Sequence, residues 1–246
     1  LEIYPMFDLD HIREFQLEIT SYCNAACPQC PRNLNGHGIN PYMPLTHLSA
    51  ATIDRAFDSD ICQDLRQIFF CGSYGDPIMH PDFRNILQDF RRKNPQLWLY
   101  IHTNGGAHDT AYWQEIAKIM NGYGQIDFGI DGLEDTLHLY RKNVKYTKVI
   151  ENAQAFIGAG GRAQWNFIVF KHNEHQVDAV RELGMTLGFH NVLIRNTGRF
   201  FNHNTLEELP SWPVTDKTYV LEPPSNSKYR NTSMLFLPDL KKQYTD

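Results

Sequence analysis

Six short runs of β-branched and aromatic residues recur along this chain, and segments with helical periodicity separate them. The runs span 15–20, 65–72, 97–104, 125–131, 163–170 and 191–196. Strands that alternate with helices build βαβ units, in which neighbouring strands run parallel. Six units suit either an open doubly wound sheet or a partial β/α barrel, and no convincing seventh or eighth unit follows. The expected fold class is therefore α/β.

Apolar residues at positions i, i+3, i+4 and i+7 predict helices with one buried face. The stronger patterns cover 83–90, 147–157 and 177–187, and weaker ones cover 49–58 and 110–121. Thr147 is the candidate N-cap of its helix, and Gly188 is the expected residue just past the end of the helix before it. These helices supply the crossovers between the strands.

The alternation ends after residue 196, where Pro, Asn, Ser and aromatic residues dominate. We therefore expect a β/α domain over 1–196 and an irregular C-terminal extension over 197–246. Within the extension, TYVLE (218–222) and SMLFLP (233–238) are candidate strands.

Composition and charge narrow the functional classes. The 246 residues carry a net charge of −5 with no long basic run, so nucleic-acid binding is not indicated. No apolar run approaches the roughly 18 residues of a membrane span. The first residues resemble no secretory signal, and five cysteines is an odd number for a disulfide framework. Both features favour a reducing compartment, and we expect a cytoplasmic protein.

Three of the five cysteines, Cys23, Cys27 and Cys30, lie together just after the first predicted strand. Functional loops follow the carboxyl ends of strands in both candidate architectures. Three kinds of site are open. One is a zinc site with His37 as fourth ligand, in a non-catalytic interaction domain; its spacing fits the usual paired turns poorly. A second is a Cys27–Cys30 redox pair, which leaves Cys23 unused. The third is an iron–sulfur cluster with one iron left open.

Further motifs follow the next three predicted strands. CGSYGDP follows the second strand, HTNG ends the third, and GIDG followed by LYRKN ends the fourth. Together with Cys-x3-Cys-x2-Cys after the first strand, they resemble the radical S-adenosylmethionine (radical SAM) superfamily. The likeness is greatest to its peptide- and protein-modifying, SPASM-related branch, and runs from about residue 15 to 196. It implies a partial (β/α)6 TIM-like barrel.

The resemblance also implies cofactors and a reaction. Cys23, Cys27 and Cys30 would bind a [4Fe–4S] cluster, whose fourth iron binds the amino and carboxylate groups of S-adenosylmethionine (SAM). Reductive cleavage of SAM would give a 5′-deoxyadenosyl radical, which abstracts a substrate hydrogen. The expected enzyme is oxygen-sensitive and takes electrons from a donor such as a flavodoxin or ferredoxin. A peptide or protein is the expected substrate, and a small molecule or nucleotide is the alternative.

Residues at the strand ends are the predicted SAM contacts. A glycine-containing turn lets main-chain groups approach a ligand closely, and an arginine matches a carboxylate with two hydrogen bonds. Ile168 is expected against adenine or in the core, and Thr103 and Asn104 beside the cofactor or in an Asx turn. Arg141 is expected on the SAM carboxylate or exposed. The full set is Gly72, Ser73, Tyr74, Gly75, Asp76, Thr103, Asn104, Asp131, Arg141, Ile168 and Arg195.

The sequence departs from the superfamily pattern at several positions. Ser73-Tyr74-Gly75-Asp76 replaces Gly-Gly-Glu, Gly129 stands where Ser is frequent, and Gln29 stands where an aromatic residue is common. Cys62 and Cys71 are expected to be buried thiols and not cluster ligands. No cysteine follows Cys71, so the Cys-rich C-terminal extension typical of the branch, with its auxiliary clusters, has no counterpart in this sequence.

Overall fold

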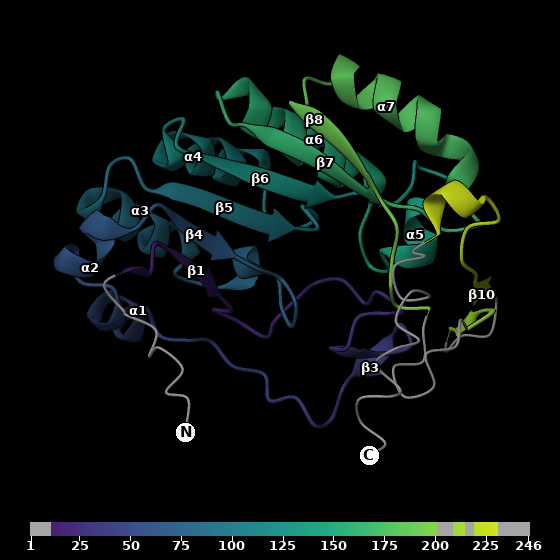
Figure 1. Ribbon diagram of the computed structural model, residues 1–246, viewed down its shortest axis with the longest axis horizontal. Helices are drawn as coiled ribbons and strands as arrows, with labels where there is room; N and C mark the ends of the chain where they lie inside the picture. The colour runs from purple at the N-terminus through teal and green to yellow at the C-terminus, as the bar shows by residue number, and fades with distance from the viewer. Residues whose placement is uncertain (1–10, 201–208, 215–218, 231–246) are drawn as a thin grey trace, which may run out of the picture.

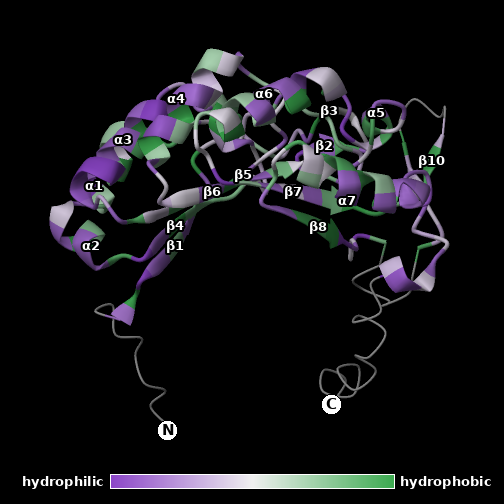
Figure 2. Cartoon of the chain, turned by 90° about the horizontal axis from the view of Figure 1, so that it is seen from above, coloured by the Kyte–Doolittle hydropathy of each residue, from purple (hydrophilic) through white to green (hydrophobic). Residues whose placement is uncertain are grey.

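The computed structural model describes residues 11–200, 209–214 and 219–230. Six parallel strands form one sheet in chain order: β1 (Glu14–Leu17), β4 (Gln67–Phe70), β5 (Trp98–Thr103), β6 (Gly124–Gly129), β7 (Ala163–Ile168) and β8 (Asn191–Arg195). Each strand lies within a predicted run or begins one residue before it. The sheet curves into a crescent with β1 and β8 at its two edges, so the partial barrel expected from the resemblance is confirmed and does not close (Figure 2).

Helices cover the convex side of this crescent (Figures 1 and 2). They are α1 (Ala50–Ala56), α2 (Ser59–Asp64), α3 (Phe83–Lys93), α4 (Thr110–Met120), the short α5 (Leu137–Tyr140), α6 (Tyr146–Gly158) and α7 (Val177–Thr186). Among the described residues, no helix is long and apolar enough to cross a bilayer.

Shorter elements lie in the segments that connect or follow the main strands and helices. Two-stranded pairs form between β2 (Asn33–Leu34) and β3 (His37–Ile39), and between β9 (Trp212–Pro213) and β10 (Val220–Leu221). Single 3₁₀ turns are η2 (Pro77–Met79), η3 (Glu174–Gln176) and η4 (Ser227–Tyr229). The predicted TYVLE strand is thus present as β10, whereas SMLFLP lies outside the described residues.

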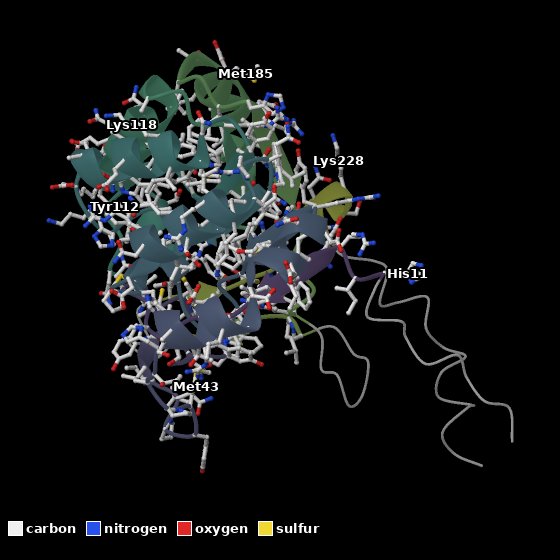
Figure 3. All side chains as sticks on the ribbon, turned by 90° about the vertical axis from the view of Figure 1, so that its left-hand side faces the viewer. His11, Met43, Tyr112, Lys118, Met185 and Lys228 are labelled. Atoms are coloured by element: carbon white, nitrogen blue, oxygen red, sulfur yellow. The ribbon has the colours of Figure 1, made fainter. Side chains whose placement is uncertain are left out.

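The two faces of the sheet differ in chemistry, as the period of two in a strand allows. Ile68, Phe70, Leu99, Ile101, Ile126 and Phe128 are fully buried on the convex face. The apolar stripe of α3 packs there, with the Phe70 and Phe83 rings 5.3 Å apart. Outward-facing side chains such as Lys118 on α4 and Met185 on α7 are exposed (Figure 3). The apolar core therefore lies between helices and sheet, and the concave face carries mainly polar residues, with Phe69 packed against the Tyr100 and His102 rings.

The helix expected over 49–58 is present as α1, and a second helix that was not predicted, α2, follows it with Asp58 as its cap, which accepts a bond from the Ile61 N–H. One local prediction needs correction. Helix α6 begins at Tyr146, so Thr147 is inside the helix and Lys145, with extended backbone, is the N-cap. Gly188 does follow α7 with φ +87°, as predicted.

Candidate functional site

One cavity of about 310 Å³ opens at the carboxyl ends of the strands. Of the fourteen predicted ligand and cofactor residues, thirteen line it; the exception is Tyr74, which is half exposed on the surface. The other lining residues are Ala25, Arg32, Asn33, Cys71, His102, Asp127, Gly129, Tyr140, Asn166 and Arg199. Residues far apart in sequence thus meet because parallel strands end at one rim of the sheet.

The cysteine loop is held at its base by the segment that precedes α1. Ser21 Oγ donates to the Pro44 carbonyl at 2.8 Å and accepts from the Thr46 N–H at 2.8 Å. The Ser21 carbonyl in turn accepts from Arg32 Nε at 2.7 Å, which ties the far end of the loop to its start. These bonds fix where the three thiols sit relative to the sheet.

The pKa values of two thiols of the loop are raised, which favours their protonated form at neutral pH. Burial raises the pKa of Cys23 to about 12, and the nearby Asp76 and Cys27 add to this effect. Burial also raises the pKa of Cys27, although the Arg141 guanidinium opposes the shift. Because metal ligation requires thiolates, a metal bound by these two cysteines would displace their protons.

The turn after β4 touches the cysteine loop directly. A Cβ atom on Gly75 would lie 2.0 Å from the Thr20 carbonyl oxygen, so only glycine fits there. The next residue, Asp76, donates its N–H to the Tyr22 carbonyl at 2.8 Å. The two strand-end loops are therefore packed backbone against backbone.

The Asp76 carboxylate faces the protein and is 3% exposed. It accepts hydrogen bonds from Thr103 Oγ1 at 3.0 Å, from the Asn104 N–H at 2.8 Å and from Asn104 Nδ2 at 2.7 Å. Burial raises the pKa of this carboxyl group. Aspartate in place of the usual glutamate thus serves to hold the end of β5. The Asx turn is also present, because Asn104 Oδ1 accepts from the Gly106 N–H at 2.8 Å.

Arg141 is paired inside the cavity wall and does not point to solvent. Its Nε donates to Asp131 Oδ2 at 2.6 Å, and the other Asp131 oxygen accepts from the Ile168 N–H at 2.7 Å. A Cβ on Gly129 would lie 2.3 Å from Arg141 Nη2. Glycine at this position, where the superfamily often has serine, therefore leaves room for the guanidinium.

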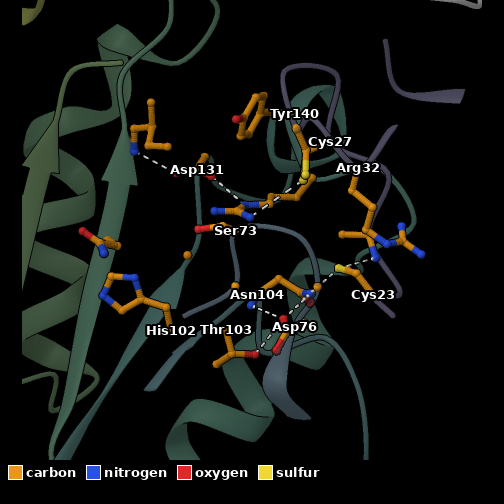
Figure 4. Close-up of a pocket in the computed structure, with 18 of the residues that line it drawn as sticks. Cys23, Cys27, Arg32, Ser73, Asp76, His102, Thr103, Asn104, Asp131 and Tyr140 are labelled. Atoms are coloured by element: carbon orange, nitrogen blue, oxygen red, sulfur yellow. Dashed lines mark hydrogen bonds and ion pairs between the residues drawn. The ribbon is translucent and has the colours of Figure 1, made fainter. Parts of the chain in front are cut away.

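Side-chain N–H groups reach two of the three cysteine sulfurs (Figure 4). Asn104 Nδ2 lies 3.7 Å from Cys23 Sγ, and Arg141 Nη1 lies 3.7 Å from Cys27 Sγ. The backbone N–H of Ala25 also donates to Cys23 Sγ at 3.3 Å. These sulfurs are thus in contact with donors that suit electron-rich, metal-bound thiolates.

A hydrogen-bond network centred on Asp127 covers the concave face below the cavity rim. This buried carboxylate accepts from Tyr100 Oη, Gln125 Nε2, Gln164 Nε2 and Asn166 Nδ2 at 2.6–3.1 Å. His102 Nε2 lies 3.2 Å from its Oδ2. The Tyr100 hydroxyl donates its proton to Asp127, so it can only accept a hydrogen bond from His102. His102 Nε2 therefore carries a proton, and His102 Nδ1 points away from this carboxylate.

Sequence reasoning missed His102 and Asp127, although their signal was available. They stand at alternate, inward-facing positions of β5 and β6 and are paired in register. Tyr140 and Arg199 carried no comparable signal in the sequence. Arg199 lies in the irregular segment after β8, which brings it near the cysteine loop, where its Nη1 donates to the Gln29 carbonyl at 3.0 Å. The prediction that Cys71 is a buried thiol needs correction. This cysteine is half-buried, lines the cavity and contacts Ser73 Oγ at 3.2 Å.

The donor set at this rim fits an iron–sulfur cluster. Three cysteines from one loop line a single wall, N–H donors face two of their sulfurs, and space remains in front of them. Among the described residues, no three His, Cys, Asp or Glu side chains converge where one metal ion could bind.

Comparisons with known proteins agree with this arrangement. The family description "Radical SAM superfamily" matches residues 17–183. Streptococcus suis SuiB bound to S-adenosylmethionine superimposes with a TM-score of 0.60 at 17% identity, over 74% of this chain and 40% of SuiB. The anSMEcpe structure with bound AdoMet gives 0.59 at 17% identity, over 75% of this chain and 49% of that one. No curated protein matches.

An open β/α crescent with a cysteine-lined cavity at its strand ends has the architecture of an enzyme whose chemistry takes place at the rim of a partial barrel. Because the family match covers more than half of the sequence, the chain belongs to the radical SAM superfamily. The enzymes of this superfamily use a [4Fe–4S] cluster and SAM. The chain spans less than half the length of the SuiB and anSMEcpe chains described above.

Proposed function

We propose that Cys23, Cys27 and Cys30 hold the cluster and that the adjoining cavity binds SAM for hydrogen abstraction from a peptide or protein. The observation that carries the proposal is the convergence of three thiols and the strand-end residues on one cavity. When bound, the two cofactors supply a 5′-deoxyadenosyl radical. The protein itself binds the cofactors and the substrate, orients them and shields them from water.

Arg141 is the proposed ligand of the SAM carboxylate. Asp131 and Cys27 occupy its Nε and Nη1, and no described residue accepts from Nη2, which lies over Gly129. Burial alone would lower the pKa of Arg141, but the negative charge of the adjacent Asp131 outweighs burial and raises this pKa well above its usual value, so the group stays charged. A fixed cation with a free N–H suits a carboxylate ligand.

The remaining cofactor contacts are proposed for the turn after β4 and the ends of β5, β7 and β8. Gly72, Ser73 and Gly75 present main-chain groups at the cavity, and Ile168 presents an apolar surface suited to adenine. Asp76, Thr103, Asn104 and Asp131 bond mainly to one another or to other protein groups, so their proposed role is to position these contacts. Tyr74 is outside the cavity and is dropped from the set.

A peptide substrate is supported by two observations. The concave face is polar and open between β1 and β8, with His102 and Arg195 on the cavity wall. In addition, the SuiB structure bound to precursor peptide SuiA and the anSMEcpe structure with AdoMet and Cp18Cys peptide share this fold, with TM-scores of 0.60 and 0.55. A cytoplasmic location and a flavodoxin- or ferredoxin-like electron donor complete the proposal, because low-potential clusters need a reducing compartment.

The test is anaerobic reconstitution with iron and sulfide, followed by low-temperature EPR with and without SAM. We expect a cubane signal that changes on adding SAM, and formation of 5′-deoxyadenosine. Cys27→Ala should lose the cluster, whereas Cys62→Ala, a buried cysteine outside the cavity, should keep it. A fully loaded cluster in Cys27→Ala, or wild-type protein holding one zinc and no iron, would contradict the proposal.

The substrate proposal has its own test. The reconstituted enzyme is incubated with SAM, reductant and a library of short synthetic peptides. Mass spectrometry then reports hydrogen loss or cross-linking in the peptides, and 5′-deoxyadenosine is measured in parallel. Acceleration of 5′-deoxyadenosine formation by nucleosides, with none by any peptide, would favour the nucleotide alternative.

A further inference from the structure

Two buried carboxylates stand behind the two N–H donors that reach the cysteine sulfurs. Asp76 Oδ2 accepts from Asn104 Nδ2 at 2.7 Å, and the same nitrogen lies 3.7 Å from Cys23 Sγ. This nitrogen also donates to Asn24 Oδ1 at 2.8 Å, so its two N–H groups serve three acceptors and Cys23 shares one of them. Asp131 Oδ2 accepts from Arg141 Nε at 2.6 Å, and Arg141 Nη1 lies 3.7 Å from Cys27 Sγ. We call these the Asp76–Asn104–Cys23 relay and the Asp131–Arg141–Cys27 relay.

We propose that the two relays set the reduction potential of the cluster by directing N–H groups at two of its three cysteine sulfurs. The inference rests on the proposed function, because it takes Cys23 and Cys27 as cluster ligands. It goes further by giving Asn104 and Arg141 a role toward the cluster that does not depend on SAM. They are positioning and tuning residues, since they act through the sulfurs.

The physical reason is the charge of the reduced cluster. Adding an electron increases the negative charge on the ligand sulfurs, and an N–H donor stabilises that charge more than it stabilises the oxidised state. The reduced state gains further from the full positive charge of Arg141. Both relays should therefore raise the potential and make reduction easier for a biological donor.

The carboxylates make the donors rigid. Asp76 is 3% exposed and Asp131 is fully buried, and each holds its donor with a hydrogen bond of 2.7 Å or less. Neither donor can turn away to water without leaving a buried carboxylate short of a partner, which is costly. No described side chain donates to Cys30 Sγ, so the two relays act on one part of the cluster.

The experiment is an EPR-monitored redox titration of the reconstituted enzyme without SAM. Arg141→Gln and Asn104→Ala should each shift the midpoint potential to a more negative value. Arg141→Lys keeps the charge but cannot bond Asp131 and Cys27 together, so it should fall between wild type and Arg141→Gln. Arg195→Gln is the matched control: it removes a positive charge from the same cavity, but Arg195 bonds to Asn166 and to no cysteine.

Potentials equal to wild type in Arg141→Gln and Asn104→Ala would overturn the inference. So would a shift in Arg195→Gln as large as that in Arg141→Gln, because charge alone would then explain it. If Arg141→Gln fails to assemble a cluster, Asn104→Ala and Arg141→Lys decide the question. Wild-type protein that assembles no cluster would contradict the proposed function and not the relays.

Discussion

At several positions on the rim of this sheet, the space that neighbouring atoms leave decides which residue fits, more than the chemistry of the residue itself does. Gly75 and Gly129 illustrate this, since in each case another group occupies the place of a Cβ. At Gly75 that group is main chain, which cannot move aside, and at Gly129 it is the end of the Arg141 side chain. The first position should therefore tolerate substitution far less than the second.

Gly75→Ala tests this constraint. The added methyl would lie 2.0 Å from the Thr20 carbonyl oxygen, so we expect a loss of about 3 kcal/mol in the free energy of unfolding. Urea denaturation measures the change. Gly158→Ala at the end of α6 is the control, because nothing lies within 4 Å of its Cβ position, and it should be neutral or stabilising by up to about 1 kcal/mol. Equal effects of the two substitutions would refute the packing argument.

Asp127 gives a pH-dependent prediction. Burial alone would raise its pKa, but hydrogen bonds from His102, Tyr100 and Gln125 outweigh burial and hold the pKa below its ordinary value. A carboxyl group with a depressed pKa stabilises the fold above its unfolded-state pKa of about 4, and this stabilisation is lost as the pH falls further.

We therefore expect Asp127→Asn to lower the free energy of unfolding by about 2–4 kcal/mol at neutral pH, because it replaces one of two accepting oxygens by an NH2 group that faces other donors. The difference from wild type should shrink as the pH falls below about 4. Urea denaturation across this pH range measures both effects. Asp178→Asn, whose side chain is 96% exposed, should change stability by less than about 0.5 kcal/mol at every pH.

At the scale of elements, the cysteine loop depends on a segment that is not part of the sheet. Ser21 bonds to the main chain of Pro44 and Thr46, and this contact sets the base of the loop. A hairpin, β2–β3, lies between the two partners in sequence. The connection of about thirty residues between β1 and α1 thus has a structural purpose, which is to clamp the ligand loop from outside.

Ser21→Ala should loosen this clamp. We expect a stability loss of about 1–3 kcal/mol and faster loss of iron from the reconstituted enzyme to a chelator. Ser49→Ala is the control, because it removes a helix cap at α1 and costs about 1 kcal/mol without touching the cysteine loop. Iron release at the wild-type rate in Ser21→Ala would show that the cluster, and not the clamp, holds the loop in place.

Elements were the scale at which the sequence was most informative. A period of two identifies the strands, and a period of about four identifies the apolar stripe of α3. Residues at these spacings share one face of the element, so the pattern shows directly which face is buried. The predicted site residues lie around one cavity because parallel strands share a rim. What could not be predicted were contacts between loops: the Gly75–Thr20 approach, the two relays, and Arg199 beside Gln29. Such contacts depend on how far apart the strands end in space, which no local pattern encodes.

At the scale of the whole molecule, cofactor binding and folding should be linked. A ligand that binds only the folded state stabilises it by about 2.7 kcal/mol at a concentration one hundred times its Kd. SAM should therefore raise the unfolding midpoint of the reconstituted enzyme under anaerobic conditions, as measured by near-UV circular dichroism. Cys27→Ala should abolish this shift, and a shift of unchanged size would mean that SAM binds without the cluster.

The concave face is the feature with the widest consequence. Helices lie on the outer side of the crescent, and β1 and β8 are its two edges and do not pair with each other (Figure 2). Under the proposed function, a carbon radical formed there would be quenched by any hydrogen donor that reaches it, so the site has to be closed before the radical is made. The docked substrate would supply that closure. Turnover without a partner in place should then consume SAM unproductively, and the timing of closure becomes the enzyme's safeguard.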